Sequence, residues 1–422
     1  MKTIPWLIAG LRTPFAKLDG PLKQLDAISL SVPVVQAMAK QPANKKPDLL
    51  IWGAVAPNLG WSNIAREVLI DASLNQTIPA CTTIMACSTS MAGAFQAAGM
   101  LKQGALDLAL VGGVESMSRI QIGLNQNLSD WVHRFFQRRS IGERLEVFTE
   151  LNFRDIRLHI PSVTNRATKK SMGEHTEIMA KEWKISRRAQ DKFALLSHER
   201  AVRAQRDNFF ESLVIPIGDL KRDTNPRTDT SLEKLERLQP AFDKTSGQGT
   251  LTAGNSSPLT DGAAAIWVAN DLGLAKLPTE LPRAKLIDWE MAAVDIFNEG
   301  LLMAPAYAIP RLLIRNRLTY KDIDLWELHE AFSAQVLCNV AALESKNFLA
   351  NKVGINESLG EFPWERLNPN GGSIALGHPF AATGARILSQ AVKELFLKGQ
   401  GRRAIVSICA DGGLGTVCLI ET

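Results

Sequence analysis

The sequence predicts an α/β protein built from two similar halves, with a third segment inserted between them. In the first and last thirds of the 422 residues, short apolar stretches alternate with segments of helical spacing. In both thirds a buried strand runs into paired glycines, at Leu110-Val-Gly-Gly113 and at Ile405-Val-Ser-Ile-Cys-Ala-Asp-Gly-Gly413. Residues 119–250 are polar and charged, with weak strand signals. These observations predict a duplicated α/β core with an insertion.

The first third has the pattern of successive βαβ units, which predicts a parallel sheet. Its longest helix is rich in Ala, Met and Leu, and Gly104 supplies a stop after it. Small residues recur all round this helix, so we expect it to be buried. The expected elements are a strand at 4–9, a helix at 27–39, a strand at 48–55, a helix at 64–72, an extended segment at 77–84, the long helix ending at 102 and a strand at 106–113.

The inserted segment contains one distinctive stretch, from Trp131 to Arg139. On a helix, Trp131, Phe135 and Phe136 would share one side and arginines would surround the rest. A basic amphipathic helix of this kind is suited to anionic lipid or to a partner subunit, although an ordinary surface helix has the same pattern. A long polar helix is expected at 186–206.

The last third repeats the organisation of the first. A glycine turn at 251–259 leads into a helix or strand ending at 269, and 271–282 is a linker. We expect strands at 286–289, 325–328, 404–408 and 416–420, and helices at 305–316, 331–344 and 382–398. The predicted domains are an N-terminal half at 1–118 completed by 251–275, an inserted cap at 119–250 and a C-terminal half at 276–422.

Composition excludes several classes of protein. Hydrophobic content of 45% and charged content of 22% are typical of a globular protein, and a net charge of +5 gives no case for nucleic-acid binding. The five cysteines are scattered without a CxxC pair, which indicates free thiols in a reducing compartment rather than disulfides or zinc. No apolar run is long enough to span a membrane, and the start lacks a cleavage site. We expect a cytoplasmic protein.

Cys87 stands at the entrance of the long helix. A thiol just before a helix N-terminus feels unpaired N–H groups and the positive end of the macrodipole, which lower its pKa and favour the reactive thiolate. The alternative is a small buried residue with no chemical role, which is common for free cysteine. The helix alone leaves both interpretations open.

Three other corners between strands and helices carry reactive side chains. His329 follows the strand at 325–328, His378 lies in a glycine-rich loop before the helix at 382–398, and Cys409 follows the strand at 404–408. Each has a structural explanation, as a helix cap, a loop hydrogen bond or a core residue. Together they supply a Cys–His pair for attack on a carbonyl and a second thiol for proton transfer. Metal binding is less expected, because no ligands have a motif spacing.

These corners and their flanking motifs resemble those of the thiolases, from residue 12 almost to the end of the chain. The histidine that opens His329-Glu-Ala-Phe332 and the basic stretch at 131–139 make the chain most similar to the β subunits of fatty-acid oxidation trifunctional complexes. The matching blocks are Cys87-Ser-Thr-Ser90, Gly112-Gly-Val-Glu-Ser-Met-Ser118, Met172-Gly-Glu-His-Thr-Glu-Ile-Met-Ala180, Thr252-Ala-Gly-Asn-Ser-Ser257, His329-Glu-Ala-Phe332, Gly377-His-Pro-Phe380 and Cys409-Ala-Asp-Gly-Gly-Leu-Gly415.

The resemblance implies a thiolase fold, with two duplicated βαβ halves in αβαβα layers and an inserted loop domain. It implies a 3-ketoacyl-CoA thiolase of fatty-acid β-oxidation, with coenzyme A as co-substrate, no bound cofactor and no metal. The implied partners are a second copy in a homodimer, a hydratase/dehydrogenase α subunit and a membrane surface contacted through 131–139.

Site residues follow from the same resemblance. Cys87 would attack the C3 keto carbon, and His378 would take the thiol proton. Cys409 would protonate the acetyl-CoA enolate and later deprotonate incoming coenzyme A. His329, through a bound water, would complete an oxyanion site with His378.

Two further residues are implied at the edge of the site. The backbone N–H groups of Cys87 and Asp411 would form a second oxyanion site, and Ser257 would lie along the pantetheine of coenzyme A. Asp411 departs from the glycine or alanine common in the family, and an inward carboxylate would oppose an oxyanion.

Three alternatives follow. A biosynthetic acetoacetyl-CoA thiolase has the same residues, because the reaction is reversible. A scaffold subunit with weak activity is the alternative that Asp411 raises. A decarboxylating ketoacyl synthase, which shares the fold, uses one cysteine with two histidines and has no need of Cys409.

Overall fold

The computed structural model describes residues 4–42, 46–152, 154, 156–161 and 163–422. Contacts divide the described chain into two units. The main unit comprises residues 1–55, 63–119 and 164–422, and the small unit comprises residues 56–62 and 120–163. Residues 164–250, predicted to belong to the inserted cap, therefore lie in the main unit.

The N-terminal half of the main unit is centred on two fully buried strands, β5 (Leu108–Glu115) and β8 (Thr260–Ala269). They pair antiparallel, and β3 (Leu49–Gly53) pairs parallel with the other edge of β5. The segment ending at 269, for which the sequence left helix and strand open, is thus a strand. The other elements are β1 (Trp6–Ile8), β2 (Ala16–Lys17), β4 (Ala80–Thr82), α1 (Ala27–Ala39), α2 (Ile64–Asp71), α3 (Thr89–Lys102) and α9 (Asp271–Leu274).

The C-terminal half repeats this arrangement. β10 (Leu325–Leu328) pairs parallel with β11 (Arg403–Ala410), and β11 pairs antiparallel with β12 (Leu414–Glu421). β9 (Arg283–Ala293) pairs with β12 as β1 pairs with β8, antiparallel in both cases. The ladder order β3-β5-β8-β1 is therefore matched by β10-β11-β12-β9, and the predicted duplication is confirmed.

A single path of strands joins the halves, because β1 pairs with β8 on one edge and with β9 on the other. The expectation of a parallel sheet is wrong for much of this path. β11 and β12 are joined by residues 411–413 alone, and so short a turn cannot carry the crossover that parallel strands need. The path runs β10-β11-β12-β9-β1-β8-β5-β3-β4.

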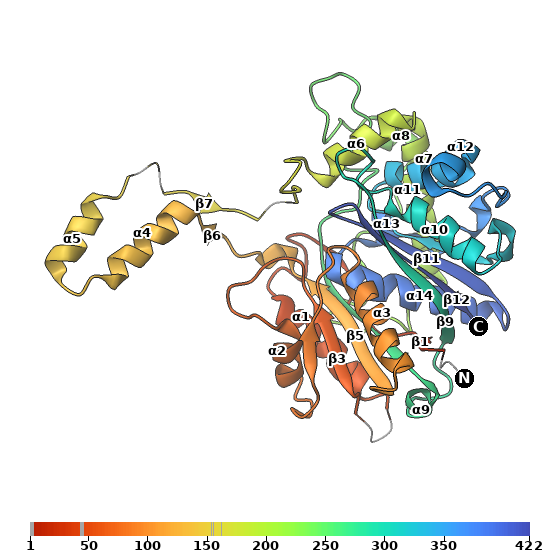
Figure 1. The fold of residues 1–422 in the computed structure, drawn as a ribbon, viewed down its shortest axis with the longest axis horizontal. Coiled ribbons are helices and arrows are strands. Elements are labelled where there is room, and N and C mark those ends of the chain that lie inside the picture. The colour runs from red at the N-terminus through yellow and green to blue at the C-terminus, as the bar shows by residue number, and fades with distance from the viewer. Residues whose placement is uncertain (1–3, 43–45, 153, 155, 162) are drawn as a thin grey trace. The chain divides into compact units, whose positions relative to one another are not determined.

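Two helices, α3 and α14 (Thr383–Lys398), pack against each other between the strands of the two halves (Figure 1). Small residues allow the close approach. A Cβ on Gly384 of α14 would come within 2.3 Å of the backbone nitrogen of Met91 on α3, and one on Gly93 would come within 3.0 Å of Ile51. The expected burial of the long helix is confirmed.

Other helices cover the outer faces of the strands. α1 packs on β8, and α10 (Ala304–Arg315) packs on β9 and β12. The remaining helices of the main unit are α6 (Met172–Glu182), α7 (Arg187–Arg206), α8 (Leu232–Glu236), α11 (Ser333–Glu344), α12 (Lys346–Phe348) and α13 (Ser373–Leu376).

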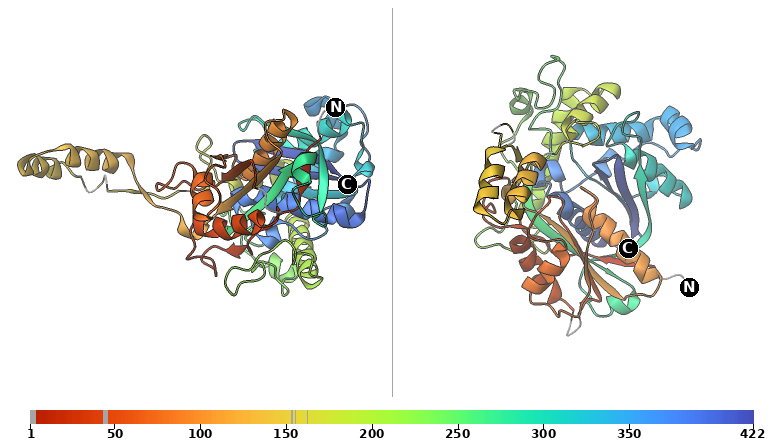
Figure 2. Two further views of the ribbon diagram at one scale, coloured as in Figure 1. Left: turned by 90° about the horizontal axis from the view of Figure 1, so that it is seen from below. Right: turned by 60° about the vertical axis from the view of Figure 1, so that its left-hand side comes forward.

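The small unit contains a pair of helices that lie side by side, α4 (Gln126–Gln137) and α5 (Ile141–Thr149) (Figure 2). They are flanked by the antiparallel strands β6 (Gly123–Leu124) and β7 (Leu158–His159). The ring of Trp131 stacks on Phe135, and its Nε1 donates to the carbonyl of Val147 on α5 at 2.8 Å.

The three predicted apolar residues of α4 differ in exposure. Trp131 and Phe135 are partly buried beside α5, whereas Phe136 is 71% exposed. None of the helices in the described residues is both long and apolar enough to cross a bilayer.

Candidate active site

Cys87 ends a tight loop two residues before the first residue of α3. Ala86 has a φ of +45°, a left-handed conformation that is uncommon outside glycine. Thr89 holds this conformation, because its Oγ1 accepts from the N–H of Met85 at 2.9 Å and donates to the carbonyl of Ala86 at 2.7 Å. The first turn of the helix thus fixes the loop that carries the thiol.

His378 lies in the loop before α14, and this loop is docked on β8. Its backbone N–H donates to Thr260 Oγ1 at 3.0 Å. Gly377 has a φ of +105°, and a Cβ there would overlap Thr260. At the start of α14, the N–H of Ala385 donates to Ser90 Oγ of α3 at 2.8 Å. The N-termini of the two central helices are therefore tied together, which brings their two entry loops to one place.

The thiol and the imidazole meet directly. Sγ of Cys87 lies 3.1 Å from Nε2 of His378. On the other side of the ring, Nδ1 lies 2.7 Å from Thr383 Oγ1, whose hydroxyl also lies 3.2 Å from the carbonyl of Pro379. A carbonyl can only accept, so the Thr383 proton goes to Pro379 and Nδ1 donates to Thr383. This leaves Nε2 without a proton and able to accept one from the thiol.

His329 and Cys409 come from the ends of two adjacent parallel strands, β10 and β11, which open at the same sheet edge. The ring centroids of His329 and His378 are 4.2 Å apart. Both His329 and Cys409 are almost fully buried, at 1% exposure. Burial raises the pKa of the Cys409 thiol well above its usual value, and the neighbouring Cys87 sulfur adds to the rise. The structure thus brings the four predicted side chains together.

The charge state of the pair differs from the sequence-based expectation. Burial raises the pKa of Cys87 to about 12, the Asp411 carboxylate adds to the rise, and backbone N–H groups of Asp411 and Cys87 oppose it. A backbone N–H group at the helix entrance, that of Cys87, does lower this pKa, but desolvation outweighs it, so the expected net fall is wrong. Burial, helped by the charge of Arg386, lowers the pKa of His378 to about 3. The resting pair is therefore a neutral thiol beside a neutral imidazole, and the thiol gives up its proton only as it attacks.

Asp411 presents different groups to different neighbours. Its backbone N–H opposes the rise in the pKa of the Cys87 thiol. Its Oδ1 accepts from Nδ2 of Asn165 at 2.8 Å and from the N–H of Gly412 at 2.6 Å. Asn165 is itself held, since its Oδ1 accepts from the N–H of Ala167 at 3.0 Å. The carboxylate is thus bound by a loop that no motif in the sequence connects with the site.

Ser257 lies beside the His329 segment, where its N–H donates to the carbonyl of Ala331 at 3.0 Å. Within the described residues, potential ligand atoms of Cys87, His329 and His378 lie within 4.8 Å of one another, a group with the donor types for a metal ion. In this structure the Cys87 and His378 members of the group hydrogen-bond to each other instead.

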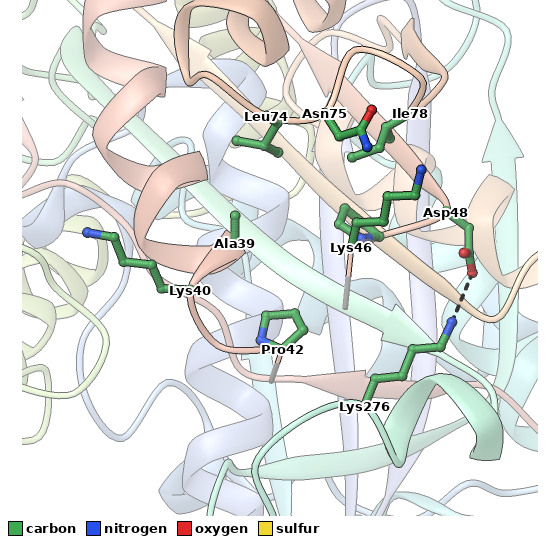
Figure 3. A pocket seen from close by; sticks show the side chains of 10 residues that line it. Ala39, Lys40, Pro42, Lys46, Asp48, Leu74, Asn75, Ile78 and Lys276 are labelled. Carbon is green, nitrogen blue, oxygen red and sulfur yellow. Dashed lines mark ion pairs between the residues drawn. The ribbon is translucent and has the colours of Figure 1, made fainter. Parts of the chain in front are cut away.

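A hollow of about 890 Å³ lies elsewhere, near the N-terminal end of β3 (Figure 3). Lys276 forms an ion pair with Asp48 there, at 3.5 Å. Its lining contains no cysteine or histidine, so it lacks the nucleophile and base found at Cys87. The lining residues are Ala39, Lys40, Pro42, Lys46, Pro47, Asp48, Leu74, Asn75, Ile78 and Lys276.

Comparisons with known proteins agree with this geometry. The family described as "Thiolase, N-terminal domain" matches residues 6–271, and "Thiolase, C-terminal domain" matches residues 280–422. The chain is 36% identical to a 3-ketoacyl-CoA thiolase of Shewanella sp. (strain W3-18-1), over 98% of this chain and 96% of the relative. It is 36% identical to the 3-ketoacyl-CoA thiolase of Alteromonas mediterranea, over 99% and 96%.

Solved structures give the same result. The Bacillus anthracis acetyl-CoA acetyltransferase superposes with a TM-score of 0.79 at 29% identity, covering 100% of this chain and 99% of the other. The Acat5 thiolase of Ascaris suum, solved in complex with coenzyme A, has a TM-score of 0.79 at 26% identity, with 99% and 100% covered.

Proposed function

This chain belongs to the thiolase family of acyltransferases, and on that premise we propose that it is a 3-ketoacyl-CoA thiolase. It would cleave a 3-ketoacyl-CoA with coenzyme A into acetyl-CoA and an acyl-CoA shortened by two carbons, as in fatty-acid β-oxidation. The observation that carries the proposal is the contact of 3.1 Å between Cys87 Sγ and an unprotonated Nε2 of His378, with the Cys409 thiol of β11 close enough for the two sulfurs to interact electrostatically. The names of the relatives in Shewanella and Alteromonas support the substrate class.

The first half of the reaction needs a nucleophile, a base and a proton donor. The Cys87 sulfur bonds to the C3 carbon as its proton moves to His378 Nε2. The C2–C3 bond then breaks, which leaves an acyl group on Cys87 and the enolate of acetyl-CoA. The enolate takes a proton at C2 from Cys409. His378 and His329 would donate to the thioester oxygen of that enolate, where preorganised donors contribute most.

The second half returns the enzyme to its starting state. The Cys409 thiolate takes the proton of the coenzyme A thiol, whose sulfur attacks the acyl group on Cys87. Cys87 leaves as a thiolate and regains its proton from His378. The N–H groups of Cys87 and Asp411 would hold the acyl oxygen, and Ser257 would lie along the pantetheine. Coenzyme A enters as a co-substrate, and no step calls for a bound cofactor.

A thiolysis assay tests the proposal. The enzyme is expected to consume acetoacetyl-CoA and longer 3-ketoacyl-CoA substrates only when coenzyme A is present. Asp411→Ala is expected to raise kcat by less than about tenfold, because it removes a negative charge that opposes the oxyanion. Cleavage would be followed by loss of the ketoacyl-CoA absorbance. No turnover by either protein would favour the scaffold alternative.

The chain-length profile separates the degradative enzyme from a biosynthetic acetoacetyl-CoA thiolase, the second candidate. That candidate is supported by the structural similarity to the Bacillus anthracis acetyl-CoA acetyltransferase. A kcat/KM that stays level or rises from four to ten or more carbons supports the degradative enzyme. Activity confined to four carbons would support the biosynthetic one.

A homodimer is proposed from the edge strand β4. Among the described residues, β4 pairs on one side only, with β3, and the following Ile84 is 61% exposed. An unpaired edge with an exposed apolar side chain is suited to pairing with a second copy. Light scattering should give twice the chain mass of 46.2 kDa, and a mass of one chain would reject the dimer.

The paired helices of the small unit are the proposed contact with an anionic membrane. Exposed apolar side chains on α4 and α5, including Phe136 at 71% and Ile141 at 78%, combine with the basic residues of 131–139. Burial of the apolar side chains among lipid acyl chains and attraction of arginine to anionic headgroups would act together. The proposed hydratase/dehydrogenase α subunit is the alternative occupant of the same surface.

Flotation with vesicles tests this contact. The protein is expected to float with anionic phosphatidylglycerol vesicles, and Phe136→Ser/Ile141→Ser is expected to lower the bound fraction by about tenfold. Leu397→Ser, which changes an apolar side chain of 66% exposure on α14, serves as the matched control. The surface would instead be assigned to the partner if the wild-type protein did not float and if it bound an α subunit that the double variant failed to bind.

A further inference from the structure

His329 has one engaged ring nitrogen and one free ring nitrogen. Its Nδ1 lies 3.0 Å from Ser373 Oγ on α13. Its Nε2 is buried and has no hydrogen-bond partner among the described residues. The ring lies against His378, and one of its nitrogens is within 4.8 Å of the Cys87 sulfur. A donor with no partner in the protein is what an oxyanion site needs, provided that this nitrogen carries the proton.

The position of the His329 proton depends on Arg386, which acts through Ser373. Nη2 of Arg386, on α14, donates to Ser373 Oγ at 2.6 Å. A guanidinium has donors only, and Arg386 keeps its charge at neutral pH because its pKa, although lowered by burial, stays at about 10. Ser373 Oγ therefore accepts from Arg386. Among the described residues the other hydrogen-bond partner of this hydroxyl is Nδ1 of His329, so the serine proton is satisfied only if Nδ1 accepts it, which places the ring proton on Nε2.

We infer that Arg386 and Ser373 are positioning residues that fix His329 as the Nε2–H tautomer and so provide the oxyanion donor of the site. Thr383 fixes the opposite tautomer in His378, with a bare Nε2. Two adjacent imidazoles thereby receive different roles, one as base and one as donor. Burial, followed by His378 and Arg386, lowers the pKa of His329 well below its usual value. The donor is thus a neutral imidazole, which keeps its proton and leaves protonation of the enolate to Cys409.

The kinetic test of this inference rests on the proposed function, because it measures thiolysis. The spectroscopic test needs only the protein without substrate. Ser373→Ala is expected to lower kcat by about 10- to 100-fold with KM changed less than about twofold, because an oxyanion donor acts in the transition state. In the His329→Asn background, where no tautomer remains to be fixed, Ser373→Ala is expected to cost less than about twofold. Ser389→Ala is the matched control, because this buried serine of α14 hydrogen-bonds to the backbone of Gly10 and Ala265.

Nuclear magnetic resonance of protein labelled with 15N-histidine reads the tautomer itself. With six histidines in the chain, the His329 signals are assigned by their loss in His329→Asn. The wild-type pattern should be that of an Nε2–H ring, and Ser373→Ala should shift it toward the Nδ1–H ring. An unchanged His329 pattern in Ser373→Ala, or an equal kinetic cost in both backgrounds, would overturn the inference. If the wild-type enzyme cleaved no ketoacyl-CoA, the proposed function would fail while the tautomer result still decided the inference.

Discussion

Cys87→Ser is expected to abolish acyl-enzyme formation while it leaves substrate binding intact, with kcat lowered by about 10⁴-fold or more. The hydroxyl occupies the same place beside His378 but is a far weaker acid than the thiol. It also leaves much less readily when coenzyme A attacks the acyl group. Mass spectrometry of protein quenched during turnover should show the acyl adduct on wild-type Cys87 and none on the variant.

The control for this result is a change of a cysteine outside the site. Cys338 is a buried residue of α11 with no place in the proposed reaction, and Cys338→Ala should still form the adduct. An acyl adduct found on Cys87→Ser at the wild-type level would show that another residue is the nucleophile. Unchanged binding of a ketoacyl-CoA, measured by calorimetry, would show that the variant is folded.

Cys409→Ser is expected to lower thiolysis by about 10³-fold, through loss of proton transfer rather than loss of the nucleophile. The raised pKa of the Cys409 thiol suits it to return a proton to a basic carbanion, and a hydroxyl is much less acidic. Exchange of the acetyl-CoA methyl protons with deuterated water, followed by mass spectrometry, should fall by a similar factor.

A different acyl donor separates the two cysteines. An acyl thioester of an acidic aryl thiol needs no proton when the thiol leaves, so it should still acylate Cys87 in Cys409→Ser. Cys87→Ser should not be acylated by the same compound. If Cys409→Ser exchanged the methyl protons at the wild-type rate, Cys409 would not be the acid and base of the reaction.

Local patterns predicted the elements well. The expected helix at 27–39 and strand at 325–328 coincide with α1 and β10. Asp26 explains the first, because its carboxylate accepts from the N–H of Ser29 and fixes the start of the helix. Strand direction was harder to predict. β8 pairs antiparallel with β5 although some 150 residues separate them in the chain, and the residues of either strand do not indicate whether its partner runs parallel or antiparallel.

In the site too, local sequence motifs predict which residues are candidates, whereas contacts between residues far apart in the chain could not be predicted. Strand-to-helix corners with Cys, His and glycine identified Cys87, His329, His378 and Cys409 as candidates, and the fold brings these four together. Sequence alone could not show the contact of Asn165 with Asp411, which joins residues 246 apart. Nor could it show the direction of the Cys87 pKa shift, because desolvation depends on what packs around the sulfur.

The neutral resting state of Cys87 and His378 has a consequence for the lifetime of the protein. Peroxide and other two-electron oxidants attack thiolates far faster than thiols. Because Cys87 holds its proton when no substrate is present, the idle enzyme exposes almost none of the oxidisable form. A pair held permanently as thiolate and imidazolium would react with substrate without a proton transfer, but its sulfur could be oxidised at any time. Here the sulfur loses its proton only as it attacks, so the oxidisable form is confined to turnover.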